Sequence, residues 1–465
     1  MLSKVRSLFS AQDMTRGKVL NNMIRFSVPL LIGNFAQQLY STIDSIVVGR
    51  SVPGGLAAIG ATMPVIFFML LMFMAISTGA GIMVSQFFGA RDFKRLGKTI
   101  GNTLMLVFFS GIVIMIVAIV GARPMLTLLN TPPEILDMSV QYMVISFIGI
   151  LGAAYYNIGS GILRGLGDSF TPLLFLLLST VLNTILDIVF VWQLGWGVAG
   201  AAWATIISQA ISAILVLLRL YRMPTINHLT RADIKPDFKI IKELLRLGLP
   251  AGFTQGIFSL AMIMVQNLTN QMGTLVLEAN TAVIRVDGFA MMPNFTFGMA
   301  ATTFIGQNIG ARKMDRVEEG AKVVSRLALF VSLFLSLMIV LFGRYLLALF
   351  TTSEQVISLG TGMMSILAVG YVAISQTQAF GGIMRGAGDT MPSMWISLFT
   401  TVGLRVPLAY LLTYLTRSEE WPHGSPYMLN VSLLLGWIIG AVATYLWYKR
   451  GNWRDKSTAR LSGHQ

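Results

Sequence analysis

The chain of 465 residues contains no cysteine, only three histidines and few charges, since 12% of its residues are Asp, Glu, Lys or Arg. The absence of cysteine excludes disulfides and thiol chemistry. His228, His423 and His464 stand in polar segments without metal-ligand spacing, so we expect neither an enzyme nor a bound metal or cofactor. Soluble proteins carry about 25% charged residues, and the low charge content therefore excludes an ordinary soluble chain.

The chain is rich in hydrophobic residues. Hydrophobic residues make up 55% of the chain, and its mean hydropathy is +0.71. Apolar runs of about 20 residues cross a bilayer as helices, because irregular backbone cannot face lipid. We therefore expect an all-α integral membrane protein with twelve transmembrane helices. The predicted spans are 23–48, 57–84, 99–122, 138–160, 171–194, 197–218, 245–271, 279–306, 323–346, 357–383, 392–416 and 427–448.

The basic residues gather on one side of this topology. If both termini and the even-numbered loops share a side, that side holds 28 of the 34 Lys and Arg residues. Basic loops stay in the cytoplasm, so we expect a multi-pass protein of the plasma membrane, the inner membrane of a bacterium, with both termini cytoplasmic. The net charge of +14 then reports topology. The expected partners are the bilayer and small organic substrates, without nucleic acid, and we expect a monomer.

Two motifs occur twice, and both are repeated at the same distance along the chain. Gln-Phe-Phe-Gly-Ala-Arg, which ends at Arg91, recurs as Gln-Asn-Ile-Gly-Ala-Arg, which ends at Arg312. Six spans per half is an even number, so the two halves have the same orientation, as in transporters built from parallel repeats. The predicted domains are a cytoplasmic segment 1–22, an N-lobe 23–218, a cytoplasmic linker 219–242, a C-lobe 243–448 and a cytoplasmic tail 449–465.

The second repeated motif is Arg-Gly-x-Gly-Asp, which follows the fourth and tenth spans. It runs from Arg164 to Asp168 and again from Arg385 to Asp389. Its glycines permit positive φ in a tight turn, and the aspartate or the next residue is suited to cap the following helix. We interpret the four charged residues as a structural turn; the alternative is a gate contact that breaks during transport.

Together, the two repeated motifs and the 6+6 arrangement of spans resemble the multidrug and toxic compound extrusion (MATE) family. The resemblance covers essentially the whole chain, from about residue 15 to 450. It implies two six-helix bundles in a V-shaped, two-lobe transporter. It also implies export of organic compounds in exchange for H⁺ or Na⁺, by a rocker-switch movement between inward-open and outward-open states.

The first span carries a polar face. Gln37, Tyr40, Ser41 and Asp44 are spaced i, i+3, i+4 and i+7, so they lie on one side of a helix. A carboxylate at the middle of a bilayer costs at least about 2.5 kcal/mol, which makes Asp44 a functional candidate. We expect Asp44 to bind the coupling cation and the other three residues to line a substrate cavity.

The fifth span adds Asn183 and Asp187, one turn apart on one face. Asn157 in the fourth span and Thr205 in the sixth complete the polar set of the N-lobe. Two neighbouring carboxylates in a low dielectric cannot both stay ionised at low cost, so one is expected to bind a proton near neutral pH. The same oxygens suit a desolvated Na⁺. The alternative is that these groups only hold the N-lobe together by hydrogen bonds.

The repeat provides an internal control. In the second copy, the counterparts of Asp44, Asn183 and Asp187 are Val265, Leu404 and Leu408. The polar groups were not copied, so a lobe can form without them. The five N-lobe residues match the branch of the resembled family with an N-lobe cation site, the DNA-damage-inducible-protein-F-like branch. Another branch has Glu in the seventh helix and Asp in the tenth, and this chain has glutamines there instead.

The C-lobe has charged residues of both signs within its spans. Asp287 and Arg285 lie two apart on the eighth span, and Arg405 lies in the eleventh. We expect Asp287 to form a structural ion pair with Arg405 or Arg285; the alternative is a substrate-binding acid. The other C-lobe candidates for a substrate cavity are Gln255, Met262 and Met291. Methionine suits an adaptable pocket, although ordinary packing is the alternative.

We therefore predict an ion-coupled exporter of organic, cationic drugs or toxic metabolites, with H⁺ or Na⁺ as coupling ion and its carboxylates in the N-lobe. The alternative within the same superfamily is a flippase or exporter of lipid-linked or other endogenous substrates. A carrier of the major facilitator type also has 6+6 spans, but its loop pattern Gly-x-x-x-Asp-[Arg/Lys]-x-Gly is absent after Gly89.

Overall fold

The structure, a computed structural model, describes residues 12–223 and 235–454. Eight side chains of helix α2 are outside this description, namely Leu39, Ser41, Thr42, Ile43, Asp44, Ser45, Ile46 and Arg50. Every regular element in the described ranges is a helix. The predicted all-α fold class is therefore confirmed.

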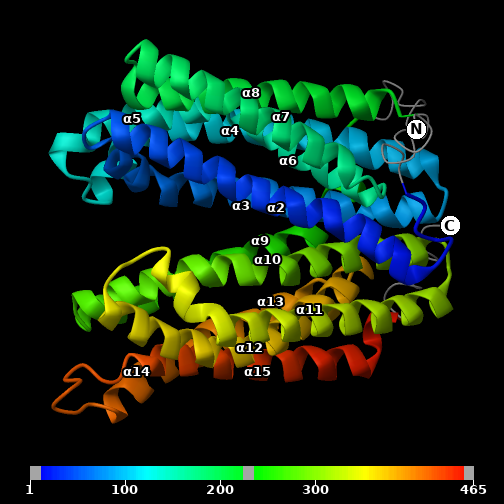
Figure 1. The fold of residues 1–465 in the computed structure, drawn as a ribbon. Helices are drawn as coiled ribbons and strands as arrows, with labels where there is room; N and C mark the ends of the chain where they lie inside the picture. Colours follow the sequence, from blue (N-terminus) through cyan, green and yellow to red (C-terminus); the bar gives the residue numbers. More distant parts are fainter. Residues whose placement is uncertain (1–11, 224–234, 455–465) are drawn as a thin grey trace. The chain divides into compact units, whose positions relative to one another are not determined.

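The helices that precede residue 222 match the first six predicted spans and are coloured from blue to green in Figure 1. The fourth span consists of two helices, and the fifth continues from an α-helix into a π-helical segment, η1. The bounds are α2 Val19–Ser51, α3 Gly55–Gly89, α4 Phe93–Leu128, α5 Pro133–Ile148, α6 Ile150–Gly165, α7 Phe170–Asp187, η1 Ile188–Gln193 and α8 Gly197–Tyr221.

The remaining helices match the other six predicted spans. Here the eleventh span is made of three consecutive segments, with the π-helical η3 in the middle. The bounds are α9 Phe238–Gln271, α10 Thr274–Gly310, α11 Met314–Ala348, α12 Glu354–Gly386, α13 Met391–Ser397, η3 Leu398–Arg405, α14 Val406–Leu415 and α15 Tyr427–Arg450.

Most of these helices have the length and hydropathy of membrane spans. Within residues 12–223 and 235–454, nine satisfy both requirements, and the bent pair α5–α6 brings the number up to ten. Helix α10 is 37 residues long but carries polar side chains such as Asp287 and Asn294, and it is not among them. The chain is a multi-pass membrane protein.

The chain forms two compact units whose limits differ from the predicted domains. The first unit is Met1–Met14 with Arg25–Gly252, and the second is Thr15–Ile24 with Phe253–Gln465. The division thus falls inside helices α2 and α9, and not in the predicted linker 219–242. Residues 224–234 of that linker are outside the described residues.

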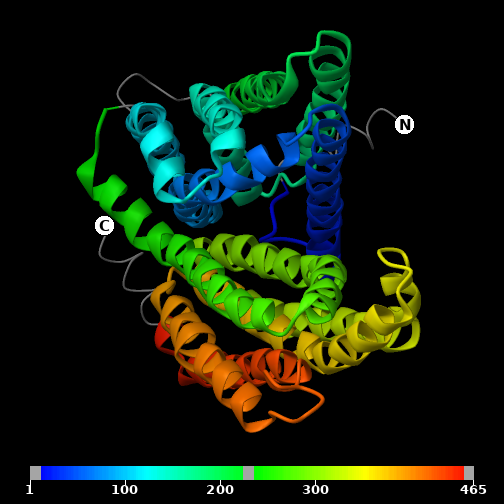
Figure 2. The same cartoon turned by 90° about the vertical axis from the view of Figure 1, so that its left-hand side faces the viewer.

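Close backbone packing explains why the first part of α9 belongs to the first unit. Helix α9 continues without a break from Phe238 to Gln271, and its first residues are part of the green segment in Figure 2. A Cβ atom on Gly248 would lie 2.0 Å from the carbonyl oxygen of Ala75 in α3, and one on Gly79 would lie 2.2 Å from that of Leu244. Glycines allow two membrane helices to approach this closely, and a hydrophobicity pattern does not show which helices do so.

The repeat is visible in the backbone. Helices α4 and α11 begin at corresponding positions of the two copies, Phe93 and Met314. The arginines before them, Arg91 and Arg312, have φ angles of 58° and 57°, a left-handed conformation that is uncommon for a residue with a side chain. The two copies therefore share their local conformation as well as their sequence.

The two glycines of the Arg-Gly-x-Gly-Asp motif have different roles. Gly167 and Gly388, the second glycines, have φ angles of 87° and 84°, as the predicted turn requires. The first glycines end helices α6 and α12, and a Cβ atom on Gly165 or Gly386 would lie 2.8 or 2.6 Å from a backbone oxygen of α3 or α10. The first glycine therefore serves helix packing, and the expectation that both permit the turn was wrong.

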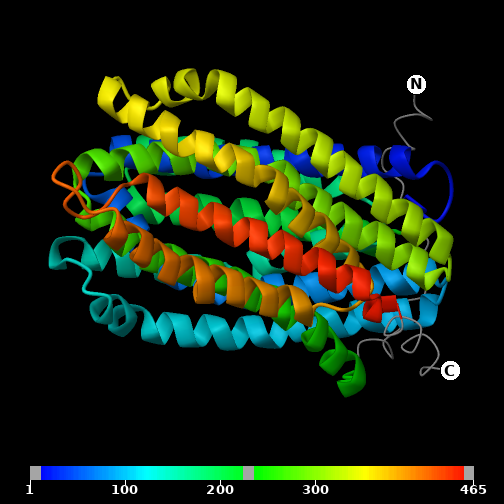
Figure 3. The ribbon, with the colours of Figure 1, turned by 90° about the horizontal axis from the view of Figure 1, so that it is seen from below.

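The halves also differ. Helices α5 and α6 meet at Gly149 with a bend of 51°, whereas the copy of this position, Gly370, lies inside the continuous helix α12. Helix α12 packs against α10, α11 and α15, and Figure 3 shows α15, the red helix, running beside it. In the second unit α12 is therefore the central helix.

Both copies leave an apolar face uncovered. Phe109, Val113 and Val120 of α4 are exposed, and so are their counterparts Phe330, Phe334 and Leu341 of α11. A soluble protein would bury such a stripe, whereas lipid solvates it without cost. This exposure agrees with the spans identified from hydropathy.

Candidate functional site

The first unit has a buried polar face on α7. Ser179, Asn183 and Asp187 follow one another at intervals of four residues and are 4%, 1% and 0% exposed. Asp187 is the last residue of α7, and η1 begins directly after it. π-Helical segments are rare and are frequent at functional sites. The structure thus places the predicted coupling acid of the fifth span at a helix irregularity.

Thr205 of α8 lies next to this face. The Asn183 side-chain amide donates to the Thr205 hydroxyl at 3.4 Å, and the Ser208 hydroxyl donates to the Thr205 carbonyl oxygen at 2.9 Å. Asn157 on α6 behaves differently: it is exposed, and its amide donates to the carbonyl oxygen of Ala153 in its own helix at 2.8 Å. The structure therefore brings Asn183 and Thr205 together, and it records no side-chain bond from Asn157 to either of them.

The predicted residues of α2 are only partly described. The side chains of Ser41 and Asp44 are outside the described residues, although both positions belong to the helix. Tyr40 is buried and Gln37 is exposed. Elsewhere in the described chain, no three His, Cys, Asp or Glu side chains are grouped so that they could hold a metal ion.

The repeated Arg-Gly-x-Gly-Asp loops make contacts that stabilise the fold. Asp168 accepts hydrogen bonds from the Thr171 backbone nitrogen at 2.9 Å and from the Thr171 hydroxyl at 2.7 Å, so it caps α7. It also forms an ion pair of 3.3 Å with Arg219. Its copy Asp389 is 4% exposed. Arg164 and Arg385 occupy the last turns of α6 and α12, where a cation interacts favourably with the helix dipole. Their role as a gate stays a prediction.

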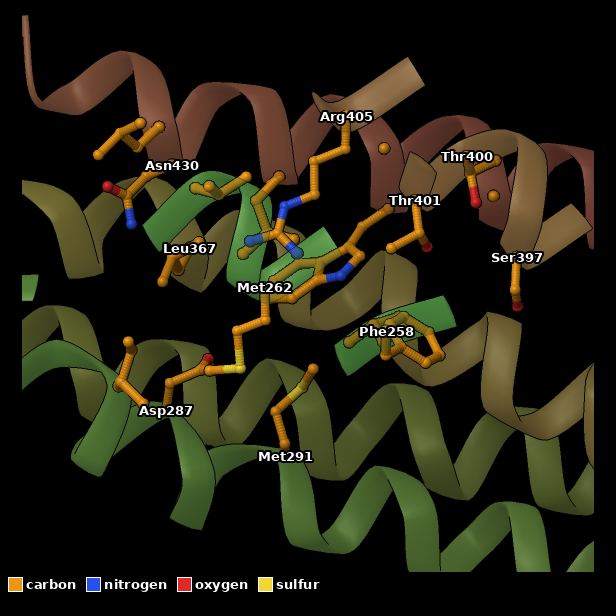
Figure 4. Close-up of a pocket in the computed structure, with 18 of the residues that line it drawn as sticks. Phe258, Met262, Asp287, Met291, Leu367, Ser397, Thr400, Thr401, Arg405 and Asn430 are labelled. Carbon is orange, nitrogen blue, oxygen red and sulfur yellow. The ribbon is translucent and has the colours of Figure 1, made fainter. Parts of the chain in front are cut away.

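The second unit contains a cavity of about 410 Å³ between α9, α10, α12, α13, η3 and α15. This volume is within the range of small-molecule sites. All four substrate-cavity candidates of the C-lobe line it, namely Gln255, Met262, Asp287 and Met291. Gln37 and Tyr40 of α2 do not. In Figure 4 the Arg405 side chain points across the cavity toward the side that carries Asp287 and Met262.

Arg405 reaches the cavity because of the local backbone. It is the last residue of η3, and Thr400 and Thr401 of the same segment also line the cavity. A π-helical turn contains an extra residue, so it changes which side chains share a face. Helix α15 approaches this segment through Gly436, where a Cβ atom would lie 3.2 Å from the Thr400 carbonyl oxygen.

The charged residues of the cavity do not form a tight ion pair. Among the described residues, no Arg nitrogen lies within 4.0 Å of an Asp287 oxygen. Arg405 and the Tyr371 hydroxyl are nevertheless the electrostatic neighbours of Asp287. Arg285 is exposed, and its guanidinium lies 5.9 Å from the centre of the Phe350 ring. Of the two partners expected for Asp287, the structure therefore favours Arg405, at a distance beyond direct contact.

Sequence reasoning missed several residues of the cavity, including Thr400, Thr401, Asn430 and Trp437. Asn430 is 4% exposed although it is an amide within an apolar helix. That contrast was a usable signal, comparable to the one that identified Asn183. Threonine and tryptophan are common in membrane helices for other reasons, so the other three positions carried no distinguishing signal.

Comparison with known proteins gives a consistent result over the whole chain. The MatE family model matches residues 29–189 and 250–411, which correspond to the two copies of the repeat. A probable multidrug resistance protein of Bacillus subtilis, YoeA, is 30% identical over 97% of this chain and 97% of its own. A probable multidrug resistance protein NorM of Thermotoga maritima is 24% identical over 85% and 86% of the two chains. A crystal structure of MATE in complex with MaL6 superposes with a TM-score of 0.88 at 25% identity, over 96% of this chain and 98% of that one.

Proposed function

The chain belongs to the MatE family of transporters, and on that premise we propose that it is a secondary antiporter that exports organic cations in exchange for H⁺ or Na⁺. Family membership makes it a transporter and not an enzyme. The names of its relatives refer to multidrug resistance, which supports drugs or toxic metabolites as the exported compounds.

The observation that carries the proposal is the buried carboxylate of Asp187. It is 0% exposed on a polar face with Asn183, whereas its copy is Leu408. The copy of Asp44 is Val265, which is 7% exposed within an apolar cluster of α9, α14 and α15. A fold that forms one lobe with apolar residues at these positions does not need acids there. Their presence in the first unit supports a functional role, and we assign them to ion coupling.

Coupling follows from competition for negative charge. A proton bound by Asp44 or Asp187 removes a charge that attracts an organic cation, and Na⁺ would have the same effect through carboxylate, amide and hydroxyl oxygens. Ion and substrate would then lower each other's affinity reciprocally, which antiport requires. We assign Asn183, Thr205 and Asn157 to orienting the carboxylates. The bias of basic residues supports cytoplasmic termini in the inner membrane of a bacterium.

The test is export from proteoliposomes that contain the purified protein. A fluorescent organic cation is loaded, and its efflux is followed under an imposed pH gradient and, separately, under an imposed Na⁺ gradient. We expect one gradient to accelerate efflux and Asp187→Asn to abolish that acceleration. Asp137→Asn is the matched control, because Asp137 is an exposed acid paired with Arg123. Efflux that responds to neither gradient would refute antiport, and an unchanged response in Asp187→Asn would refute this ion site.

A further inference from the structure

The cavity of the second unit holds one acid and one base within apolar walls. Of its lining residues in the described chain, only Asp287 and Arg405 are charged. Phe258, Met262 and Met291 contribute aromatic and thioether surface. The first unit differs, because its described membrane-embedded charge on α7 is Asp187, with an amide beside it. The two units therefore offer different electrostatic environments to a ligand.

Several polar atoms of residues that line this cavity lack a hydrogen-bond partner. Among the described residues, no hydrogen-bond partner is present for Asp287 Oδ1, Arg405 Nε or Asn430 Oδ1. Asn430 is 4% exposed, and all three residues line the cavity. Buried polar groups in proteins are nearly always satisfied. Three of them around one volume indicate a site that is built for a polar ligand.

The copies of these residues show that neither charge is needed to build the fold. In the first copy of the repeat, the counterparts of Asp287 and Arg405 are Ile66 and Thr184. Ile66 packs against the apolar core of the first unit, and the Thr184 hydroxyl donates to the Thr180 carbonyl oxygen of its own helix. Within the repeat, these two charges therefore occur in the second copy only.

We propose that this cavity binds a zwitterion with an ammonium group against Asp287, a carboxylate against Arg405 and an aromatic or aliphatic body against Phe258, Met262 and Met291. The proposal rests on the export function given above and specifies a class of substrate beyond simple cations. Because Asp287 and Arg405 are not in direct contact, a ligand that bears both charges can lie between them. Arginine is suited to the carboxylate end, since its planar group binds carboxylates through two parallel hydrogen bonds.

Charge balance provides the selectivity. A ligand with only an ammonium group would pair with Asp287 and bring a second positive charge close to Arg405. A ligand with only a carboxylate would bring a second negative charge close to Asp287. Unpaired and like charges are costly in a low dielectric, and such repulsion against the wrong ligand is an effective source of specificity. The zwitterion is the class that leaves neither residue uncompensated.

Three probes with one fluorescent body separate these classes. Nε-dansyl-lysine carries both charges, dansylcadaverine carries only the amine, and dansylaminohexanoic acid carries only the carboxylate. Equilibrium binding to the purified full-length protein is measured by dansyl fluorescence. We expect the zwitterion to bind at least about tenfold more tightly than either analogue, the ratio expected for one additional charge-assisted hydrogen bond. Organic cations are also proposed to be attracted by Asp44 and Asp187, so the probes are compared in a protein that carries Asp44→Asn and Asp187→Asn. Equal or tighter binding of dansylcadaverine in that protein, or no saturable binding of the zwitterion, overturns the proposal.

Variants then assign each end of the ligand. In Asp287→Asn, the zwitterion should bind no more tightly than the carboxylate probe, because the partner of its ammonium group is lost. In Arg405→Gln, the zwitterion should bind no more tightly than the amine probe, because the partner of its carboxylate is lost. The double variant is neutral and avoids an isolated buried charge, so it tests the site even if one single variant fails to fold. In it, all three probes should bind within about threefold of one another. A double variant that keeps the preference for the zwitterion also overturns the proposal.

Matched controls lie on the same helix. Glu278→Gln and Arg285→Gln each remove one exposed charge of α10 that does not line the cavity, and both should keep the preference for the zwitterion. Binding is measured without an ion gradient, so it is independent of coupling. Loss of gradient-driven export with intact zwitterion binding would defeat the antiport proposal alone. Gradient-driven export of cations without any zwitterion preference would defeat this inference alone.

Discussion

Two copies of one glycine should respond differently to the same substitution. A Cβ atom on Gly382 in α12 would lie 2.3 Å from the carbonyl oxygen of Gly298 in α10. On its copy Gly161 in α6, a Cβ atom would lie 2.3 Å from the hydroxyl of Ser77 and 3.1 Å from its carbonyl oxygen. The first obstacle is backbone, whereas the second is mainly the end of a side chain that can rotate. We therefore expect Gly382→Ala to destabilise the protein far more than Gly161→Ala.

The magnitudes follow from the contacts. Ordinary contacts of a Cβ atom begin at 3.4 Å, so Gly382→Ala must separate α10 from α12 by about 1 Å. Overpacking of this size against backbone costs about 3 kcal/mol, the upper end of the usual range. Alanine gains about 1 kcal/mol over glycine from helix propensity, which leaves a net loss of about 2 kcal/mol. Rotation of Ser77 in Gly161→Ala sacrifices its hydrogen bond to the Asn157 carbonyl oxygen at 3.1 Å. That loss of about 1 kcal/mol is offset by the same propensity gain.

Thermal unfolding of the purified protein in detergent, followed by tryptophan fluorescence, measures the difference. We expect Gly382→Ala to lower the Tm by about 2 °C, because about 1 kcal/mol corresponds to about 1 °C for a chain of this length, and Gly161→Ala to leave it nearly unchanged. Gly288→Ala on α10 is the control, because no heavy atom lies within 4 Å of the added Cβ atom, and it should raise the Tm. The reasoning is refuted if the Tm of Gly382→Ala equals or exceeds that of the unmodified protein, or if Gly382→Ala and Gly161→Ala lower the Tm equally.

Three further predictions concern the first unit. Asp168→Ala should lower the free energy of unfolding by about 2 kcal/mol, because it removes the acceptor of the Thr171 hydrogen bonds and the ion-pair partner of Arg219. Denaturant unfolding of the variant and of the unmodified protein checks this, and an unchanged midpoint would contradict it. If Na⁺ is the coupling ion, Na⁺ should weaken binding of an organic cation to the Asp137→Asn variant but not to the Asp187→Asn variant; titration of the bound probe with NaCl at fixed pH distinguishes them. If H⁺ is the coupling ion, cation binding should weaken as the pH falls from about 8 to about 5, because protonation removes the attracting charge. Flat binding across that range in the unmodified protein would exclude H⁺ as the competing ion.

The spans and the repeat could be read from the sequence because they depend on local properties. Hydrophobic run length decides where a helix crosses the bilayer, and the repeated motif places Arg91 and Arg312 in the same left-handed conformation. The buried polar face with Asn183 and Asp187 was likewise predictable, since it follows from a single helix period. Each of these features is fixed by neighbours within a few turns.

The tertiary structure decided what depends on contacts between distant segments. The division of α9 at Gly252 follows from glycines that let its first part approach α3, and the bend at Gly149 is absent at its copy Gly370. The cavity brings Asp287, Arg405 and Asn430 together from three helices, and η3 ends at Arg405 within a π-helical register. A period of about 3.6 residues cannot show an inserted residue in a turn, and lipid-facing and helix-facing apolar residues look alike in sequence. The pairing of helices, and with it the cavity, therefore required the folded chain.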